Sequence, residues 1–352
     1  MEKLSNTTKL TNDVKLLNLN ETSNTAHSNT NDTTNNSLNT TNINSSIPLE
    51  DQSKEVRVAM IGNVDSGKST LVGVLTKCTL DDGRGYLRSL ISNYSHEKEL
   101  GKTSSIAHEI MGFDENGNQI APERVNEKKN TAWSQVTKKS SKIISLIDLC
   151  GHEQYLKTTM FGLSGLLPDY AMIVVGANMG IQRMTKEHLG IALSLKIPII
   201  IVVTKIDLAP KEIKDKTLED LKKILQHTTV KRNPILVDDE TKFEDNNIGI
   251  LNNIDCPIFF VSSTKGDGIS KLRYFMSLLT SRASDIKKRF ACEDNGNKVE
   301  FLIDSVFSVK GIGLVTSGIL VSGIVTSGQT LMIGPNSKGT IFKKIKYILF
   351  IR

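Results

Sequence analysis

The sequence is poor in cysteine and has no apolar run long enough to cross a membrane. Its four cysteines, Cys78, Cys150, Cys256 and Cys292, are scattered and form no CxxC pair. This scatter argues against a metal or disulfide framework and indicates reduced thiols in a cytoplasmic protein. The longest apolar runs, YAMIVVGANMGI and IPIIIVV, fall well short of the roughly 20 residues that a membrane helix needs. The N-terminus also lacks the apolar core of a secretory signal.

Charge and length set only broad limits. The 352 residues carry a formal net charge of +6, which is compatible with an RNA-rich partner without requiring one. The length favours two domains, one of them with room for a large core. Residues 1–53 are dominated by Asn, Thr and Ser. Such a segment buries too little apolar surface to offset its ordering entropy, so we expect a disordered tail.

From Val56 onward, short apolar runs alternate with helical patterns. The expected strands lie at 56–62, 142–149, 170–177, 197–205 and 256–263. The expected helices lie at 67–77, 153–165, 185–195, 217–226 and 268–280. Strands that are apolar on both faces and alternate with helices are typical of a doubly wound, mostly parallel sheet. We therefore predict an α/β domain over residues 54–284.

Two stretches interrupt this alternation, at about 113–140 and 228–254, and we interpret both as surface insertions. The DENGN sequence at 114–118 is expected to form a hairpin turn, because no Glu follows at the spacing of a calcium loop. After a linker at 285–297, residues 298–352 show short β-branched runs and glycine turns. This texture predicts the opening strands of a β-barrel.

The sequence GNVDSGKST, at 62–70, satisfies the phosphate-loop pattern G-x-x-x-x-G-K-[ST], with an expected strand before it and a helix after it. Its glycines let backbone N–H groups point at phosphate oxygens, and the helix N-terminus favours negative charge. Lys68 is expected to bridge the β- and γ-phosphates and Ser69 to bind Mg²⁺; the alternative is an ordinary glycine turn. The predicted nucleotide contacts are Asn63, Val64, Asp65, Ser66, Gly67, Lys68, Ser69 and Thr70.

The sequence TKID, at 204–207, ends an expected strand, where ligands bind in open α/β sheets. The Asp207 carboxylate can accept hydrogen bonds from the N1–H and exocyclic amine of guanine, so it would select GTP over ATP. A cap or loop role is the alternative for Asp207. The sequence VSSTKG, at 261–266, would close the base pocket from the other side. The predicted contacts here are Thr204, Lys205, Asp207, Ser262, Ser263 and Thr264.

Two further motifs supply candidate groups around the phosphates. In DLCGH, at 148–152, Asp148 is expected to reach Mg²⁺ through a water, and Gly151 to offer its N–H to the γ-phosphate. In GKTSS, at 101–105, Thr103 is a second hydroxyl ligand for Mg²⁺ while the γ-phosphate is present. Release of Thr103 after hydrolysis would convert bond breakage into loop motion.

Together these motifs resemble translational GTPases of the elongation factor 1-alpha/Tu type, over about residues 55–350. Within that type the chain is similar to the GTP-binding protein 1 and 2 subfamily, through LDDGRGYLRS, ELGKTSSIAHEIMGFDENGN and HEQYLKTTMFGL. The resemblance implies a P-loop GTPase domain followed by a translation-factor-type β-barrel. It implies that His152 positions the attacking water, with Lys68 and Mg²⁺ stabilising charge. It also implies a monovalent cation near Asp65, for which a turn-capping role is the alternative.

The chain departs from these relatives at three points. Thr204 stands where most of these relatives have Asn. Because a hydroxyl spans a shorter distance than an amide, we expect guanine binding to be weaker. Asp207 is expected to keep the selectivity for guanine. Lys102 stands where elongation factors have Ile, which forms an apolar barrier with Val64 before the histidine. The subfamily carries a basic residue there. The relatives have two barrels, so we expect a C-terminally shortened chain.

The resemblance implies a GTP-binding and GTP-hydrolysing switch that acts with the ribosome or RNA-surveillance machinery. A ribosome or another RNA-bound complex is then the expected partner, with aminoacyl-tRNA as a candidate. The alternatives are a non-ribosomal GTP-dependent signalling or scaffold protein, a GTPase unit that drives sulfate activation, and a truncated GTP binder. We expect a monomer with no direct contact to DNA or membranes.

Overall fold

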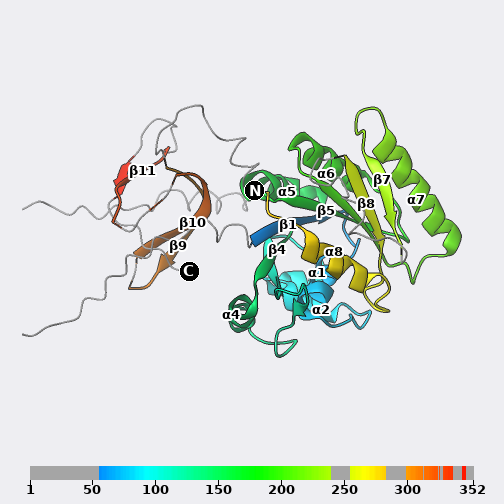
Figure 1. The fold of residues 1–352 in the computed structure, drawn as a ribbon, viewed down its shortest axis with the longest axis horizontal. Coiled ribbons are helices and arrows are strands. Elements are labelled where there is room, and N and C mark those ends of the chain that lie inside the picture. The colour runs from blue at the N-terminus through cyan, green and yellow to red at the C-terminus, as the bar shows by residue number, and fades with distance from the viewer. Residues whose placement is uncertain are drawn as a thin grey trace, which may run out of the picture. The chain divides into compact units, whose positions relative to one another are not determined.

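The computed structural model describes residues 55–238, 254–282 and, between 299 and 345, all but 312, 324, 326–327 and 336–342. The expected tail at 1–53 and the linker at 285–297 lie outside the described residues, as does most of the insertion at 228–254. The described residues from 55 to 282 form an α/β unit, and the strands after 299 are described separately below (Figure 1).

The α/β unit is built on a sheet with the strand order β3-β2-β4-β1-β5-β6-β8-β7. Strands β4, β1, β5, β6, β8 and β7 run parallel, and β2 and β3 are antiparallel to their neighbours. The predicted mostly parallel sheet is confirmed. The strands are β1 Glu55–Gly62, β2 Ala107–Phe113, β3 Gln119–Ile120, β4 Lys142–Asp148, β5 Tyr170–Gly176, β6 Ile199–Thr204, β7 Asn233–Val237 and β8 Asp255–Phe260.

Helices connect these strands and cover both faces of the sheet (Figure 1). The five helices expected from the sequence are present as α1, α5, α6, α7 and α8, and a 3₁₀ turn at Glu153–Tyr155 leads into α5. The helices are α1 Lys68–Lys77, α2 Tyr86–Ile91, α3 Ser95–Leu100, α4 Lys129–Lys139, α5 Leu156–Gly165, α6 Arg183–Ser194, α7 Lys211–Gln226 and α8 Ile269–Leu278.

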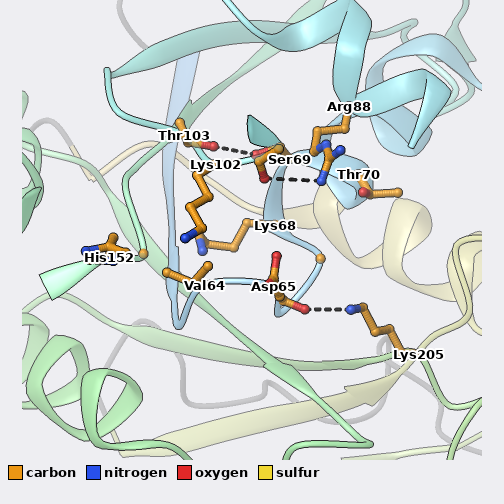
Figure 2. Close-up of a pocket in the computed structure, with 13 residues that line it drawn as sticks. Val64, Asp65, Lys68, Ser69, Thr70, Arg88, Lys102, Thr103, His152 and Lys205 are labelled. Atoms are coloured by element: carbon orange, nitrogen blue, oxygen red, sulfur yellow. Dashed lines mark hydrogen bonds between the residues drawn. The ribbon is translucent and has the colours of Figure 1, made fainter. Parts of the chain in front are cut away.

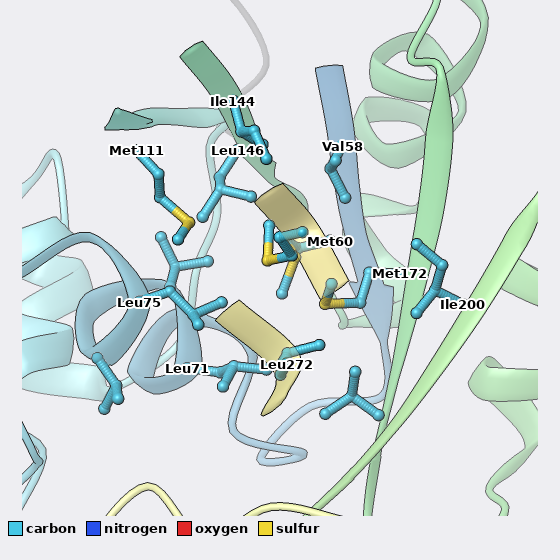
Figure 3. Packing of buried hydrophobic residues seen from close by; sticks show 14 of the residues in the cluster. Val58, Met60, Leu71, Leu75, Met111, Ile144, Leu146, Met172, Ile200 and Leu272 are labelled. Atoms are coloured by element: carbon cyan, nitrogen blue, oxygen red, sulfur yellow. The ribbon is translucent and has the colours of Figure 1, made fainter. Parts of the chain in front are cut away.

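Alternate residues of the central strands enter two separate cores, because side chains of a strand point to opposite faces in turn. Val58 and Met60 of β1 pack with residues of α1, α2 and α8, while Ala59 and Ile61 pack with residues of α5, α6 and α7. Figure 3 shows the first of these cores, where Met60 lies among side chains of α1 and α8. Burial on both faces makes β1 a rigid support for the loop that follows it.

The stretch at 113–140 is more structured than the predicted surface insertion. Its first residue, Phe113, ends β2 and is 1% exposed, and α4 packs on β2 through buried Ala132 and Val136. Two apolar residues four apart are therefore enough to seat this polar helix on the sheet, while most of the stretch stays at the surface. Its interpretation as a surface insertion stays a prediction. The predicted hairpin turn at 114–118 is confirmed: the N–H of Asp114 donates to the Asn118 carbonyl (3.0 Å), and β2 pairs with β3.

The strands after residue 299 form two antiparallel pairs. β9 (Glu300–Val309) pairs with β10 (Gly313–Ser322), and β11 (Leu331–Ile333) pairs with β12 (Lys343–Ile345). This strand content is compatible with the predicted start of a barrel. No helix among the described residues is long and apolar enough to cross a membrane. Cys78, Cys150 and Cys256 are free thiols.

The first core supports a stability prediction. Leu146 of β4 is fully buried in it, so Leu146→Ala should lower the free energy of unfolding by about 3 kcal/mol through lost burial and a residual cavity. Leu208, which is 66% exposed, provides the control, since Leu208→Ala should change it by less than about 0.5 kcal/mol. Urea unfolding followed by circular dichroism measures both. Equal effects of the two substitutions would contradict this description of the core.

Candidate nucleotide-binding site

The predicted phosphate loop joins β1 to α1 at the carboxyl edge of the sheet. Gly62 has a φ of +144°, and a Cβ there would collide with the carbonyl oxygen of Val174 on β5. Only glycine is suited to that position. Gly67, with a φ of +86°, precedes the first residue of α1, so the helix N-terminus opens onto the loop. Inside the loop, Ser66 Oγ donates to the Asn63 carbonyl at 2.9 Å.

The Lys68 ammonium lies within this loop. Its Nζ donates to the carbonyl oxygens of Gly62 (3.2 Å) and Asn63 (2.7 Å), and the residue is only 6% exposed. Burial lowers the pKa of Lys68, and the charge of Asp148 opposes that shift. Because an ammonium has three donors, these two bonds hold the loop and leave one donor for a ligand. A Cβ at Gly151 would lie 2.7 Å from the backbone carbonyl oxygen of Gly62, so glycine is needed where this segment approaches the phosphate loop.

Three oxygen-bearing side chains from separate segments meet beside Lys68. Ser69 Oγ donates to Asp148 Oδ2 at 2.5 Å and lies 2.9 Å from Thr103 Oγ1, a contact drawn in Figure 2. Burial raises the pKa of Asp148 to about 6, against the opposing effects of Lys68 and Ser69. Its Oδ1 is buried with no hydrogen-bond partner among the described residues. An unpaired carboxylate oxygen beside two hydroxyls fits a hard cation such as Mg²⁺ with its bound water.

Lys68, Ser69 and Thr103 line a pocket that is open to solvent. Four cationic side chains line it, from Lys68, Arg88, Lys102 and Lys205, against one carboxylate, from Asp65. That excess of positive charge suits a polyphosphate. The predicted site residues that line the pocket are Val64, Asp65, Gly67, Lys68, Ser69, Thr70, Thr103, Gly151, His152 and Lys205.

Asp207 lies outside this pocket, in the loop after β6, where a second loop fixes its carboxylate. Ser262 Oγ donates to Oδ1 at 2.8 Å, and Thr264 Oγ1 donates to Oδ2 at 3.2 Å. Burial alone would raise the pKa of Asp207, but these hydrogen bonds outweigh it and the pKa is lowered. The ionised carboxylate keeps further lone pairs for the donors of a guanine. Ser263 contributes its carbonyl elsewhere, accepting the N–H of Asp81 at 2.9 Å.

The loop after β6 is also tied to the phosphate loop. Thr204 is 1% exposed, and its Oγ1 donates to the Ser66 carbonyl at 2.5 Å. The end of β6 therefore lies close enough to the phosphate loop for the short Thr204 side chain to reach it. The weaker guanine binding expected from Thr204 stays a prediction. Lys205 Nζ donates to the Asp65 carbonyl at 2.6 Å (Figure 2). Two bonds thus connect the predicted base loop to the predicted phosphate loop.

His152 lines the pocket, but its ring does not face the phosphate loop. Its Nδ1 accepts the N–H of Gln154 at 3.1 Å, and the ring meets Tyr155 edge-on at a centroid distance of 6.1 Å. Figure 2 shows the imidazole directed away from Lys68. A rotation of the His152 side chain is needed before the ring can orient a water in the pocket.

Sequence reasoning missed His188 on α6, which supports the phosphate loop from below. Its Nδ1 accepts the N–H of Gly62 at 3.1 Å, and the residue is fully buried. Burial, together with the charge of Lys68, lowers the pKa of His188 to about 4. The ring is therefore neutral, with its proton on Nε2, because Nδ1 is an acceptor. A histidine on the apolar face of an expected helix was the only available signal.

Glu97 on α3 was also missed, and it organises the loop that carries Thr103. The Glu97 carboxylate is 2% exposed. Burial opposes its ionisation, but hydrogen bonds outweigh that effect and lower its pKa. The donors are the backbone N–H groups of Asn93, Tyr94, Ser104 and Ser105 and the hydroxyls of Ser104 and Ser105. On the same loop, the Gly101 carbonyl accepts Arg88 Nη1 at 3.1 Å.

The neutral His188 makes stability depend on pH. Its folded pKa of about 4 lies below the ordinary value of 6.5, so the unfolded chain binds more protons between these values and stability falls as pH falls. His188→Gln keeps an acceptor for Gly62 and removes the titration. Between pH 7 and pH 5 the wild type should lose about 2 kcal/mol more unfolding free energy than this variant.

Urea unfolding across that pH range measures the difference. Exposed His227 provides the control, and His227→Gln should follow the wild-type pH dependence. Parallel curves for the wild type and His188→Gln would show that His188 is not held neutral in the folded protein.

Comparisons with known proteins agree on one family. The sequence profile of the elongation factor Tu GTP binding domain matches residues 53–284. Among curated proteins, GTP-binding protein 1 of Xenopus laevis is 44% identical over 289 residues, which are 81% of this chain and 42% of that protein. GTP-binding protein 2 of Homo sapiens is 39% identical over 295 residues, which are 83% of this chain and 48% of that protein.

A solved structure shares the fold. The crystal structure of bacterial selenocysteine-specific elongation factor EF-Sec superposes with a TM-score of 0.50 at 24% identity, covering 84% of this chain and 41% of that one. The chain spans less than half the length of each of these three relatives. The profile match covers more than half of the chain. The chain therefore belongs to the elongation factor Tu GTP-binding domain family.

Proposed function

We propose that this protein is a switch that binds GTP with Mg²⁺, hydrolyses it and presents a different loop surface before and after hydrolysis. The contact between Thr103 and Ser69, at 2.9 Å, carries this proposal. It joins the phosphate loop to the segment at 101–106, so a change at the phosphates reaches a segment at the surface. The pocket charge and the fixed Asp207 carboxylate support GTP as the ligand.

Each predicted site residue has a role in this proposal. Lys68 donates to the β- and γ-phosphates, and Asp207 accepts from guanine. Ser69 and Thr103 would hold Mg²⁺ directly and Asp148 would hold it through a water, and the bound ion would supply positive charge beside the phosphates. His152, after rotation, orients the attacking water. The remaining proposed nucleotide contacts are Asn63, Val64, Asp65, Ser66, Gly67, Thr70, Gly151, Thr204, Lys205, Ser262, Ser263 and Thr264. A monovalent cation near Asp65 stays part of the proposal.

The proposed division of the chain follows the predicted boundaries, with a GTPase domain at 54–284 and strands of a β-barrel domain at 298–352. The proposed partner is a ribosome or another RNA-bound complex, with aminoacyl-tRNA as a candidate ligand, and the setting is the cytoplasm. The family's elongation-factor name supports the ribosome. The histidine that follows Gly151 gives such a partner a group to act on, because its ring must turn before it can orient water.

Ribosome dependence tests this role. Phosphate release from GTP should rise when ribosomes and aminoacyl-tRNA are added to the wild type. In His152→Ala that rise should fall by at least about 100-fold, the range of a lost acid–base or water-positioning group, while GTP affinity is kept. His227→Ala is the surface control and should behave as the wild type. GTP binding without stimulation by ribosomes would overturn the ribosomal role and favour a non-ribosomal signalling or scaffold protein.

Base recognition has its own test. Asp207→Asn replaces one acceptor with a donor, so GTP affinity should fall by about 100-fold through the loss of charge-assisted hydrogen bonds. Affinity for xanthosine triphosphate should rise, because its 2-oxo group can accept from the new amide. Competition against a fluorescent nucleotide measures both. Exposed Asp215 provides the control as Asp215→Asn, and unchanged GTP affinity in Asp207→Asn would disprove the assignment.

A further inference from the structure

We propose that Lys102 is a catalytic cation which the chain itself supplies to the terminal phosphate of GTP. This inference rests on the proposed GTPase function. It assigns a role to Lys102, which the proposed function does not explain. The Lys102 ammonium would donate to non-bridging oxygens of the γ-phosphate and stabilise the charge that they carry during hydrolysis. Many GTPases receive such a cation from an arginine, placed in cis or brought by a partner.

The position of Lys102 supports this role. Its side chain lines the same pocket as Val64, Lys68, Thr103 and His152. In the view of Figure 2 the Lys102 side chain extends from the loop toward the Lys68 ammonium. Lys68 is held inside the phosphate loop by two carbonyl oxygens. A phosphate bound to Lys68 would therefore have Lys102 on the side from which the 101–106 loop covers the pocket.

The charge balance also favours a ligand between these groups. The ion pairs found in the described part of the chain leave Lys102 without a carboxylate partner. Two lysine ammonium groups that face one pocket repel each other, and an exposed lysine could avoid this by turning to solvent. An anion with several oxygens, such as a triphosphate, converts the repulsion into two attractive contacts.

Hydrogen bonds hold the loop segment that carries Lys102. The next residue, Thr103, contacts Ser69 of the phosphate loop at 2.9 Å. The two residues after that are held by the buried Glu97 carboxylate through their backbone N–H groups, at 2.8 Å and 3.0 Å. On the other side of Lys102, the Gly101 carbonyl accepts Arg88 Nη1 at 3.1 Å. Lys102 thus lies one residue before the proposed metal ligand on a loop segment anchored on both sides of it. Opening of that segment would remove the cation and the hydroxyl together.

The bond changes in the step are those of hydrolysis. The water oxygen forms a bond to the γ-phosphorus, and the bond from that phosphorus to the β,γ-bridging oxygen breaks, leaving its electron pair on GDP. One water proton stays on the phosphate product and the other passes to solvent. Lys102 gives up no proton. Its ammonium only donates hydrogen bonds to oxygens of the γ-phosphoryl group, and the reaction transfers this group to water.

The test uses the full chain and three variants. Lys102→Ile removes the cation, Lys102→Arg conserves it, and Lys98→Ile is a matched control on α3, exposed and outside the pocket. Single-turnover phosphate release without ribosomes gives the rate. Competition binding with fluorescent GDP, with and without aluminium fluoride as a mimic of the transferred phosphate, gives a readout that does not depend on turnover.

We expect Lys102→Ile to slow hydrolysis by about 100-fold, the range seen when one donor to a developing charge is lost. Its GDP affinity should be kept while the gain from aluminium fluoride disappears. Lys102→Arg should restore most of both, and Lys98→Ile should match the wild type. Wild-type hydrolysis and an unchanged aluminium fluoride effect in Lys102→Ile would overturn the inference and leave a solvated loop lysine. If the wild type binds no GTP, the proposed function fails as well, so the two failures are distinguishable.

Discussion

The backbone of Gly62 lies so close to β5 that no side chain fits between them, and the rest of the site depends on this approach. The carbonyl of Val174 occupies the space on one side, and His188 takes the N–H from below. With its first residue fixed in this way, the loop turns back over the end of β1 and presents its carbonyls to Lys68. Since β1 is buried on both faces, the loop starts from a tightly packed strand.

Two buried charges then face each other across that loop at a cost to the fold. Lys68 and Asp148 each have a pKa displaced toward the neutral form by burial, and each partly offsets the shift of the other. Asp148 also has an oxygen with no hydrogen-bond partner among the described residues. Unpaired buried polar atoms of this kind are retained where a ligand satisfies them. A nucleotide with its cation would supply charge of the required sign to both groups, which makes the site a place where binding and stability are coupled.

Single hydroxyl contacts connect the site to the segments around it. Thr103 joins the loop at 101–106 to Ser69, and Thr204 joins the end of β6 to the phosphate loop. Each is one hydrogen bond, worth about 1 kcal/mol in a protein, so it can break and re-form within a working cycle. The buried Glu97 carboxylate behaves differently, because six donors converge on it. It keeps one part of the loop ordered while the contact of Thr103 with Ser69 is free to change.

The sequence by itself determined the alternation of strands and helices and the position of the phosphate-loop motif, and it predicted that Asp207 selects guanine, because these inferences depend on local patterns. A short apolar run bounded by glycine predicts a strand from neighbouring residues alone. A Gly-Lys pair at the start of a helix predicts a phosphate loop in the same way. Only the tertiary structure decided the remaining features. His188 accepts a hydrogen bond from Gly62, which lies far from it in the sequence. Glu97 on α3 accepts hydrogen bonds from the loop that follows this helix. Helix α4 packs on β2 through only two buried side chains. Whether the Thr204 hydroxyl contacts Ser66 depends on the distance between two chain segments. The direction of the His152 ring depends on a local turn in which it accepts the N–H of Gln154. A sequence pattern encodes neither the distance nor the turn.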